Sequence, residues 1–236
     1  MRYLYLQRMK QPLSRYLDHA VLKPDMTRTE AEEAINLGLR FNTRTVCIRP
    51  TDIELAKSMC RGTDTDVCVV LGFPHGCSLP SSRLAEAEAY AKREVDEVDM
   101  VSQFGMARGG EWGSFRRDIE GIFQVLHPRG ILLKVILESS VLLPNQIAQA
   151  THICSDLGVA HVKTSTGFNG GGASEEAIEI MLNAVRGNTK VKASGGIRNL
   201  EQANRFIEMG CDRLGVGFST TPVLFGDGAQ ANRSDY

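Results

Sequence analysis

The sequence has no long apolar run and no cluster of charge of one sign. No window approaches the ~18 apolar residues that a membrane-spanning helix requires. Its 27 lysines and arginines nearly balance 28 aspartates and glutamates, so the charge pattern gives no reason to expect nucleic acid or an anionic membrane as a partner. Residues 1–13 contain basic side chains but no continuous apolar stretch, and we therefore expect no secretory signal there.

The cysteines lack the spacings of metal and redox motifs. No C-x-x-C pair occurs, and no cysteine pairs with a histidine at the intervals of a zinc site. Several lie within apolar runs, as buried free thiols do. We therefore expect reduced thiols in a cytoplasmic protein, with no metal and no disulfide framework; the six residues are Cys47, Cys60, Cys68, Cys77, Cys154 and Cys211.

Short segments rich in apolar and β-branched residues alternate with helical patterns along the chain. We expect strands over residues 16–21, 44–48, 66–73, 97–103, 131–138, 159–168, 191–194 and 213–216. Such alternation indicates a parallel sheet, and eight units in this length fit a single (β/α)8 TIM barrel over residues 1–225. A doubly wound open sheet is the alternative, but no G-x-G-x-x-G follows the first strand. The polar residues 226–236 are expected to form a flexible tail.

Several residues mark the starts of helices. Thr27 and Glu30 form a T-x-x-E capping box, which predicts a helix beginning just after the threonine. Thr51 and Glu54 form a second box and predict a helix to about residue 60. Pro144 suits the first turn of a helix that continues to about residue 157. Further helices are expected over residues 81–93, 114–126, 174–185 and 199–209.

Side chains along a strand alternate between two faces. In a barrel, the face toward the helices must be apolar and the other face lines the interior. This rule turns Val98 and Met100 outward and Asp99 inward. Buried ion pairs rarely improve on apolar contacts, so a group of charged residues inside the barrel indicates catalysis. The rule collects six such residues: Asp18, Asp99, Lys134, Glu138, Lys163 and Lys192.

A lysine inside a barrel supports imine chemistry. An ordinary lysine has a pKa of ~10.4, and lowering this value to ~7 requires roughly 4 to 5 kcal/mol against the ammonium form. Burial supplies part of that free energy, and a second cation nearby supplies the rest. Lys163 and Lys192 lie on successive strands, so a charged Lys192 paired with Asp99 would keep Lys163 neutral. The neutral amine then condenses with a carbonyl, and carbon–carbon cleavage proceeds through an enamine with no metal or other cofactor.

The remaining charged residues would move protons or hold position. Asp99 and Lys192, together with Asp18, would transfer protons, and Lys134 would be a positioning charge. The reverse assignment, with Lys192 as the imine-forming residue, stays open.

Glycines follow the last three strands at their carboxyl ends. Loops after the last strands of a barrel often bind phosphate through backbone N–H groups, and Arg198 could add positive charge there. We therefore expect a phosphate-type site that includes Gly167, Gly195, Gly196, Gly215 and Gly217.

Six motifs in this order resemble the deoxyribose-phosphate aldolase family and span most of the chain. The motifs that carry lysines are specific, whereas Gly-Phe-Pro alone would not be. They occupy residues 17–24 (LDHAVLKP), 72–74 (GFP), 97–101 (EVDMV), 133–138 (LKVILE), 162–168 (VKTSTGF) and 191–198 (VKASGGIR).

The resemblance implies a class I aldolase that reversibly cleaves 2-deoxy-D-ribose 5-phosphate to acetaldehyde and D-glyceraldehyde 3-phosphate. It assigns the Schiff base to Lys163 and proton transfer to Asp99 and Lys192. It also places Thr166 and Cys47 among the substrate-binding residues. Some members of the family bring a C-terminal tyrosine into the site, a position that Tyr236 would match here, and barrel aldolases often assemble as homodimers or homotetramers.

Three segments depart from the family pattern. Ala20 replaces a usual threonine in the first motif, and residues 102–104 (SQF) replace a usual asparagine after the fourth strand. The loop after the eighth strand has Phe218 where the family commonly has a phosphate-binding serine. An alternative function is therefore a related Schiff-base aldolase for another or an unphosphorylated sugar. A non-catalytic sugar-phosphate-binding barrel is a third alternative, which the intact lysines oppose.

Overall fold

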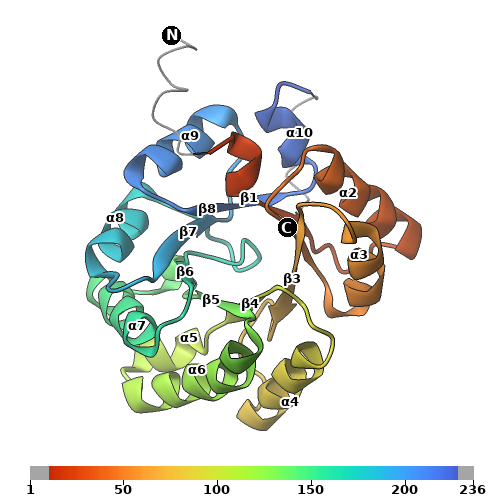
Figure 1. Ribbon diagram of the computed structural model, residues 1–236. Helices are drawn as coiled ribbons and strands as arrows, with labels where there is room; N and C mark the ends of the chain where they lie inside the picture. The colour runs from red at the N-terminus through yellow and green to blue at the C-terminus, as the bar shows by residue number, and fades with distance from the viewer. Residues whose placement is uncertain (1–10, 228–236) are drawn as a thin grey trace.

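The eight strands form a closed parallel barrel in the computed structural model, which describes residues 11–227 (Figure 1). Each strand pairs with its neighbours in sequence, and β8 closes the ring against β1. The single TIM barrel predicted from the sequence is therefore confirmed, while most of the predicted tail, including Tyr236, lies outside the described residues. The strands are β1 (Leu17–Val21), β2 (Thr45–Ile48), β3 (Asp66–Leu71), β4 (Glu97–Val101), β5 (Leu132–Ile136), β6 (His161–Lys163), β7 (Lys190–Ser194) and β8 (Arg213–Gly217).

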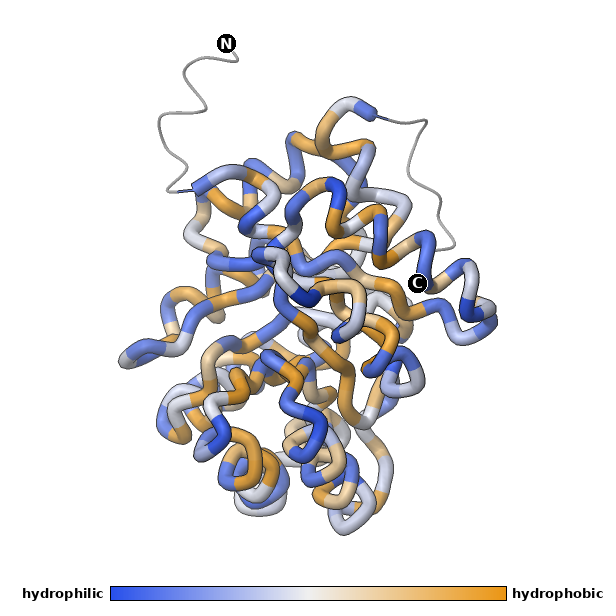
Figure 2. Tube along the Cα trace, turned by 45° about the vertical axis from the view of Figure 1, so that its right-hand side comes forward, coloured by the Kyte–Doolittle hydropathy of each residue, from blue (hydrophilic) through white to orange (hydrophobic). Residues whose placement is uncertain are grey.

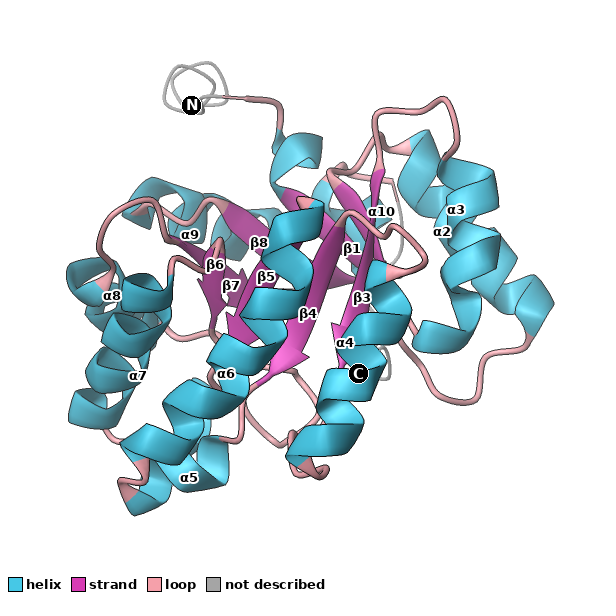
Figure 3. Ribbon diagram, turned by 60° about the horizontal axis from the view of Figure 1, so that its bottom comes forward, coloured by secondary structure: helices cyan, strands magenta, loops and turns pink. Residues whose placement is uncertain are grey.

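Helices form the layer outside the strands (Figure 3). Short 3₁₀ turns lie at Leu13–Tyr16, Pro50–Asp52, His127–Arg129 and Ser139–Val141. No helix in the described part of the chain is both long and apolar enough to cross a membrane. The α-helices are α2 (Arg28–Arg40), α3 (Ile53–Cys60), α4 (Pro80–Ala91), α5 (Phe104–Gly109), α6 (Trp112–Leu126), α7 (Pro144–Leu157), α8 (Glu175–Ala184), α9 (Leu200–Met209) and α10 (Thr220–Leu224).

The apolar core lies between the strands and the helices. Outward-facing strand residues such as Val98, Met100 and Val191 belong to one buried cluster with the inner faces of the helices. Figure 2 shows hydrophobic and hydrophilic residues alternating along these helices, as expected where one face packs on the barrel. Because this layer takes the apolar face of each strand, the other face lines the barrel interior.

Most predicted boundaries hold, but three details differ. Thr27 and Glu30 form the predicted capping box, whereas Thr51 and Glu54 do not. A 3₁₀ turn intervenes there, α3 has Asp52 as its N-cap without a side-chain cap, and Arg49 pairs with that carboxylate at 2.7 Å. The glycine-bearing segment after β4 contains the short helix α5, and β6 is only three residues long, ending at Lys163 before the turn at Gly167.

Arg83 on α4 joins three segments around the ends of β3 and β4. Its side chain is fully buried and pairs with Asp118 on α6 at 2.9 Å. It also donates to the carbonyl oxygens of Gly76 at 3.0 Å and Val101 at 2.6 Å. A Cβ added at Gly72 would lie 2.7 Å from the Arg83 guanidinium. Arg83 thus fixes the turn that leads from β3 to the carboxyl end of the barrel.

We expect Arg83→Met to lower the free energy of unfolding by about 3–5 kcal/mol, because it leaves a buried carboxylate unpaired. The matched control is Arg93→Met, whose side chain is 48% exposed and whose loss should cost less than about 0.5 kcal/mol. Urea unfolding followed by circular dichroism measures both. A cost for Arg83→Met as small as that of the control would contradict this role.

Candidate active site

The carboxylate of Asp99 is the meeting point of three lysines inside the barrel. The Nζ atoms of Lys163 and Lys192 each lie 2.7 Å from its Oδ2 atom. The Nζ atom of Lys134 lies 2.7 Å from its Oδ1 atom. Lys163 and Lys192 are register partners on β6 and β7. The strand alternation therefore predicted correctly which of these side chains face one another.

A second group of charges extends from Asp99 toward the amino ends of the strands. Asp18 contacts Lys192 and lies 3.3 Å from Lys134. Glu97 accepts a 2.6 Å contact from Lys134. Arg213 completes the group through contacts of 2.9 Å with Asp18 and 3.1 Å with Glu97.

Glu97 and Arg213 were not among the predicted inward residues, although the sequence carried a signal for both. Glu97 precedes Asp99 by two positions, so it faces the same side of β4. Arg213 precedes Gly215 by two positions on β8 and likewise points inside. A strand's first residue is easily taken for a solvated end, but Glu97 is 1% exposed and Arg213 is 6% exposed.

The charges of this network support one another. Burial by itself would raise the pKa of each of the three carboxyl groups, but Lys134 and the other cations hold all three pKa values below the ordinary range. Burial opposes the charged forms of Lys134 and Lys192, but the carboxylates outweigh it and raise both pKa values above that of a free lysine. The pKa of Arg213 is raised in the same way.

Glu138 faces inward as predicted, but its hydrogen-bond partners are residues of the loop after β6 and not the lysines around Asp99. It adopts a left-handed backbone conformation, with φ at 56°. Its carboxylate accepts hydrogen bonds from the Thr166 hydroxyl at 2.6 Å and from the Asn169 amide at 2.8 Å. Asn169 also donates to the carbonyl oxygen of Pro74. Glu138 therefore ties together the loops after β3, β5 and β6.

The turns after β6 and β7 pack backbone against backbone. Gly167, Gly195 and Gly196 all have φ between 75° and 87°, which favours glycine. A Cβ added at Gly172 would lie 2.5 Å from the carbonyl oxygen of Gly195. The backbone N–H of Ala173 donates to that oxygen at 3.0 Å. These turns therefore lie side by side at the carboxyl ends of neighbouring strands.

The other residues predicted for phosphate lie on β8 and the loop after β7. Gly215 lies within β8, where an added Cβ would meet Ser194 Oγ at 2.4 Å, so its glycine permits close packing in the barrel. Gly217 ends that strand, and the N–H of the next residue, Phe218, donates to the carbonyl oxygen of Ala20. Arg198 lies just before α9 and is partly buried.

Small apolar side chains form a wall on the β1–β3 side of the interior. This apolar wall consists of Ala20, Leu22, Cys47, Cys68 and Val70, with Phe73 and Phe168 packed against it. The two phenylalanine rings meet edge to face with centroids 5.0 Å apart. A hydrogen bond between the thiols lowers the pKa of Cys47, and burial raises that of Cys68.

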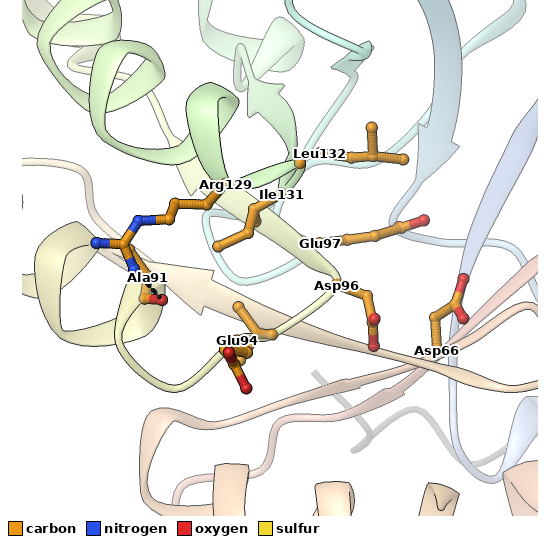
Figure 4. A pocket seen from close by; sticks show the side chains of 10 residues that line it. Asp66, Ala91, Glu94, Asp96, Glu97, Arg129, Ile131 and Leu132 are labelled. Carbon is orange, nitrogen blue, oxygen red and sulfur yellow. Dashed lines mark hydrogen bonds between the residues drawn. The ribbon is translucent and has the colours of Figure 1, made fainter. Parts of the chain in front are cut away.

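A separate pocket of about 500 Å³ opens at the amino ends of β3, β4 and β5 (Figure 4). Several carboxylates line it, including Asp66 and Asp96, and Arg129 closes one side. Glu97 borders both this pocket and the buried network. Lys163 is the last residue of β6 and lies toward the other end of the barrel, so this pocket is not the opening to the lysine.

Comparison with known proteins agrees with this architecture. Residues 13–219 match the family model described as DeoC/LacD family aldolase. Deoxyribose-phosphate aldolase 1 of Staphylococcus aureus strain MSSA476 is 36% identical over 222 residues, which cover 94% of this chain and 98% of that protein. The deoxyribose-phosphate aldolase of Staphylococcus saprophyticus is 37% identical over 203 residues, covering 86% and 91% of the two chains.

Solved structures show the same fold. The structure described as QR15, an aldolase, superposes with a TM-score of 0.84 at 32% identity, covering 92% of this chain and 96% of that chain. A tetrameric deoxyribose phosphate aldolase from Aeropyrum pernix superposes with a TM-score of 0.85 at 24% identity, covering 95% of each chain. The chain is therefore an aldolase, and it belongs to the DeoC/LacD family.

Proposed function

We propose that this aldolase reversibly cleaves 2-deoxy-D-ribose 5-phosphate to acetaldehyde and D-glyceraldehyde 3-phosphate through a Schiff base on Lys163. The relatives at 36–37% identity carry the name of this activity. Under this proposal, the substrates are sugar phosphates and small aldehydes, and the enzyme is located in the cytoplasm. It also includes assembly as a homodimer or homotetramer.

The observation that carries the proposal is the number of carboxylates that each cation contacts. Among the described residues, Lys134 contacts three carboxylates, whereas Lys192 and Arg213 contact two each. Of the carboxylates in residues 11–227, Lys163 pairs with Asp99 alone, through an oxygen that it shares with Lys192. Lys163 is therefore the cation with the least compensation.

The total charge of the network leads to the same residue. Ion pairs among the described residues connect three carboxylates to four basic side chains. A buried group of charges is most stable when it is neutral. This group carries one positive charge in excess, and Lys163 is the basic side chain in it with the fewest carboxylate contacts. Lys163 also lies at the carboxyl end of its strand, where barrel enzymes bind substrate.

Cleavage then follows from ordinary imine chemistry. The amine of Lys163 adds to C1 of the open-chain sugar, and water leaves to give an iminium ion. The iminium withdraws the electrons of the C2–C3 bond as the C3 hydroxyl loses its proton, which releases glyceraldehyde phosphate. The remaining enamine takes a proton at C2, and water releases acetaldehyde from the lysine.

Asp99 and Lys192 are the groups that we assign to these proton transfers. The Oδ2 atom of Asp99 lies 2.7 Å from the Nζ atom of Lys163 and 2.7 Å from the Nζ atom of Lys192. These distances suit general acid–base catalysis. Asp18 holds Lys192 in place, and Lys134 neutralises Asp99 from the other side. The apolar wall next to them suits the two-carbon fragment, and Cys47 belongs to that wall.

We assign the phosphate to the loops after β6, β7 and β8. Thr166 and Gly167 come from the first loop, Gly195, Gly196 and Arg198 from the second, and Gly217 from the end of β8. One contact favours the alternative of an unphosphorylated substrate. The Phe218 N–H donates to the Ala20 carbonyl oxygen at 3.0 Å, so this N–H is already used and does not offer a hydrogen bond to a phosphate.

Borohydride reduction in the presence of acetaldehyde should leave a stable two-carbon adduct on Lys163, located by peptide mass mapping. Lys192→Met should keep that adduct while lowering kcat by about 10²–10⁴, as expected for loss of a general acid–base group. Lys163→Met should show neither adduct nor activity. An adduct found only on Lys192 would reverse the two assignments.

Changing the charge of the network should move the acidic limb of the kcat/KM–pH profile in opposite directions. Glu97→Gln removes a negative charge from the network, which disfavours protonated amines there, so the limb moves to lower pH. Arg213→Gln removes a positive charge, and the limb moves to higher pH. Each shift should be on the order of one pH unit, the size of effect expected for one unit charge within the same buried network at an effective dielectric constant of ~20.

The control is Glu54→Gln, whose side chain is 78% exposed on α3 and whose profile should not move. General loss of folding would reduce the height of both profiles without shifting them in opposite directions. Shifts of the same sign in both network variants would refute the charge argument.

If the loops bind phosphate, kcat/KM for deoxyribose 5-phosphate should exceed that for free deoxyribose by at least about 100-fold, the effect of roughly two charge-assisted hydrogen bonds. Arg198→Met should reduce this ratio by about tenfold for the same reason. Steady-state rates with both sugars measure it. Equal rates on the two sugars would remove the phosphate site and select the alternative substrate.

A further inference from the structure

Two thiols line the interior beside the carboxylate that the lysines share. Cys47 on β2 and Cys68 on β3 are register partners on neighbouring strands, and both are buried in the apolar wall. The Sγ atom of Cys68 lies 3.2 Å from Oδ1 of Asp99, and the Sγ atom of Cys47 lies 4.0 Å from Oδ2. The proposed reaction gives neither thiol a chemical step.

The spacing of these donors suits a single metal ion. One ligand atom from each of the three residues lies within 4.8 Å of the other two. In a tetrahedral zinc site, Zn–S distances of ~2.3 Å and Zn–O distances of ~2.0–2.2 Å separate neighbouring donors by roughly 3.5–3.8 Å. The two measured separations, 3.2 Å and 4.0 Å, fall on either side of that range. Small side-chain rotations would therefore bring all three donors onto one ion.

Lys134 donates to Cys68 Sγ at 3.2 Å and to Asp99 Oδ1 at 2.7 Å, so its ammonium must move aside when an ion binds, but the net charge of the site stays unchanged. A metal ion binds cysteine as thiolate, so two thiols release two protons when one divalent cation enters. Soft sulfur ligands select ions such as Zn²⁺ and Cd²⁺, whereas Mg²⁺ and Ca²⁺ prefer sites built from oxygen. The donor set thus defines the class of ion.

We propose that Cys47, Cys68 and Asp99 form an inhibitory site for a thiophilic divalent cation. An ion held there binds the Asp99 carboxylate, whose Oδ2 atom Lys163 and Lys192 now share at 2.7 Å each, and competes with the lysines for it. The lysines then lose the group that exchanges protons with them. Binding depends on the three donors and on displacement of Lys134 from two of them, whereas inhibition rests on the proposed function because it acts through Asp99.

The test uses the purified full chain with Cd²⁺ as the probe. We expect one Cd²⁺ per chain by equilibrium dialysis, with the ultraviolet charge-transfer absorption of cadmium thiolate. Zn²⁺ and Cd²⁺ should inhibit cleavage of deoxyribose 5-phosphate, EDTA should restore activity, and Mg²⁺ at the same concentration should have no effect. Cys68→Ala should weaken both Cd²⁺ binding and inhibition by at least roughly tenfold, each measured relative to that variant's own metal-free activity.

The matched control is Cys77→Ala, since Cys77 is exposed whereas Cys47 and Cys68 are buried. This variant should bind Cd²⁺ and be inhibited as the parent is, and loss of both in it would overturn the proposal. Absence of bound Cd²⁺ alongside a normal borohydride adduct on Lys163 would also overturn the site, but would leave the proposed function standing. Cd²⁺ bound to the two thiolates without inhibition would instead overturn the inhibitory role.

Discussion

The sharing of one carboxylate by three lysine side chains is the constraint on which the interior depends. Asp99 accepts contacts from Lys134, Lys163 and Lys192, all of them buried. Such an arrangement is stable only if other charges compensate it, because unpaired buried ions cost several kcal/mol each. Asp18 and Glu97 supply that compensation, and Arg213, which pairs with both, leaves the network with a single positive charge in excess. Chemistry and stability are therefore set by the same balance of charges.

The barrel makes this balance possible by separating two kinds of packing. Its outward strand residues join the helices in an apolar layer, which supplies the hydrophobic stabilisation of the fold. Its inward residues are then free to be polar, since the closed ring of strands satisfies the backbone hydrogen bonds without them. A doubly wound sheet would expose both faces to helices and would leave no interior for these charges.

The alternation of strand residues was enough to predict the barrel and the meeting of Asp99, Lys163 and Lys192, because both depend on local pattern and sequential pairing. The number of carboxylates around each lysine depends on the tilt and stagger of the strands, which the sequence does not reveal. Glu97 and Arg213 escaped prediction because they begin their strands. The capping box predicted at Thr51 was wrong because a local capping signal takes no account of competing contacts, here the pairing of Arg49 with Asp52.

The contact between the turns after β6 and β7 limits how this enzyme can diversify. A side chain at residue 172 would collide with the backbone of residue 195, so neither turn tolerates growth without moving the other. The apolar wall on β1, β2 and β3 consists instead of side chains, among them Ala20 and Val70, that substitution can enlarge or reduce. New substrate ranges are therefore more accessible to evolution, or to a designed mutant library, through that wall than through the paired turns.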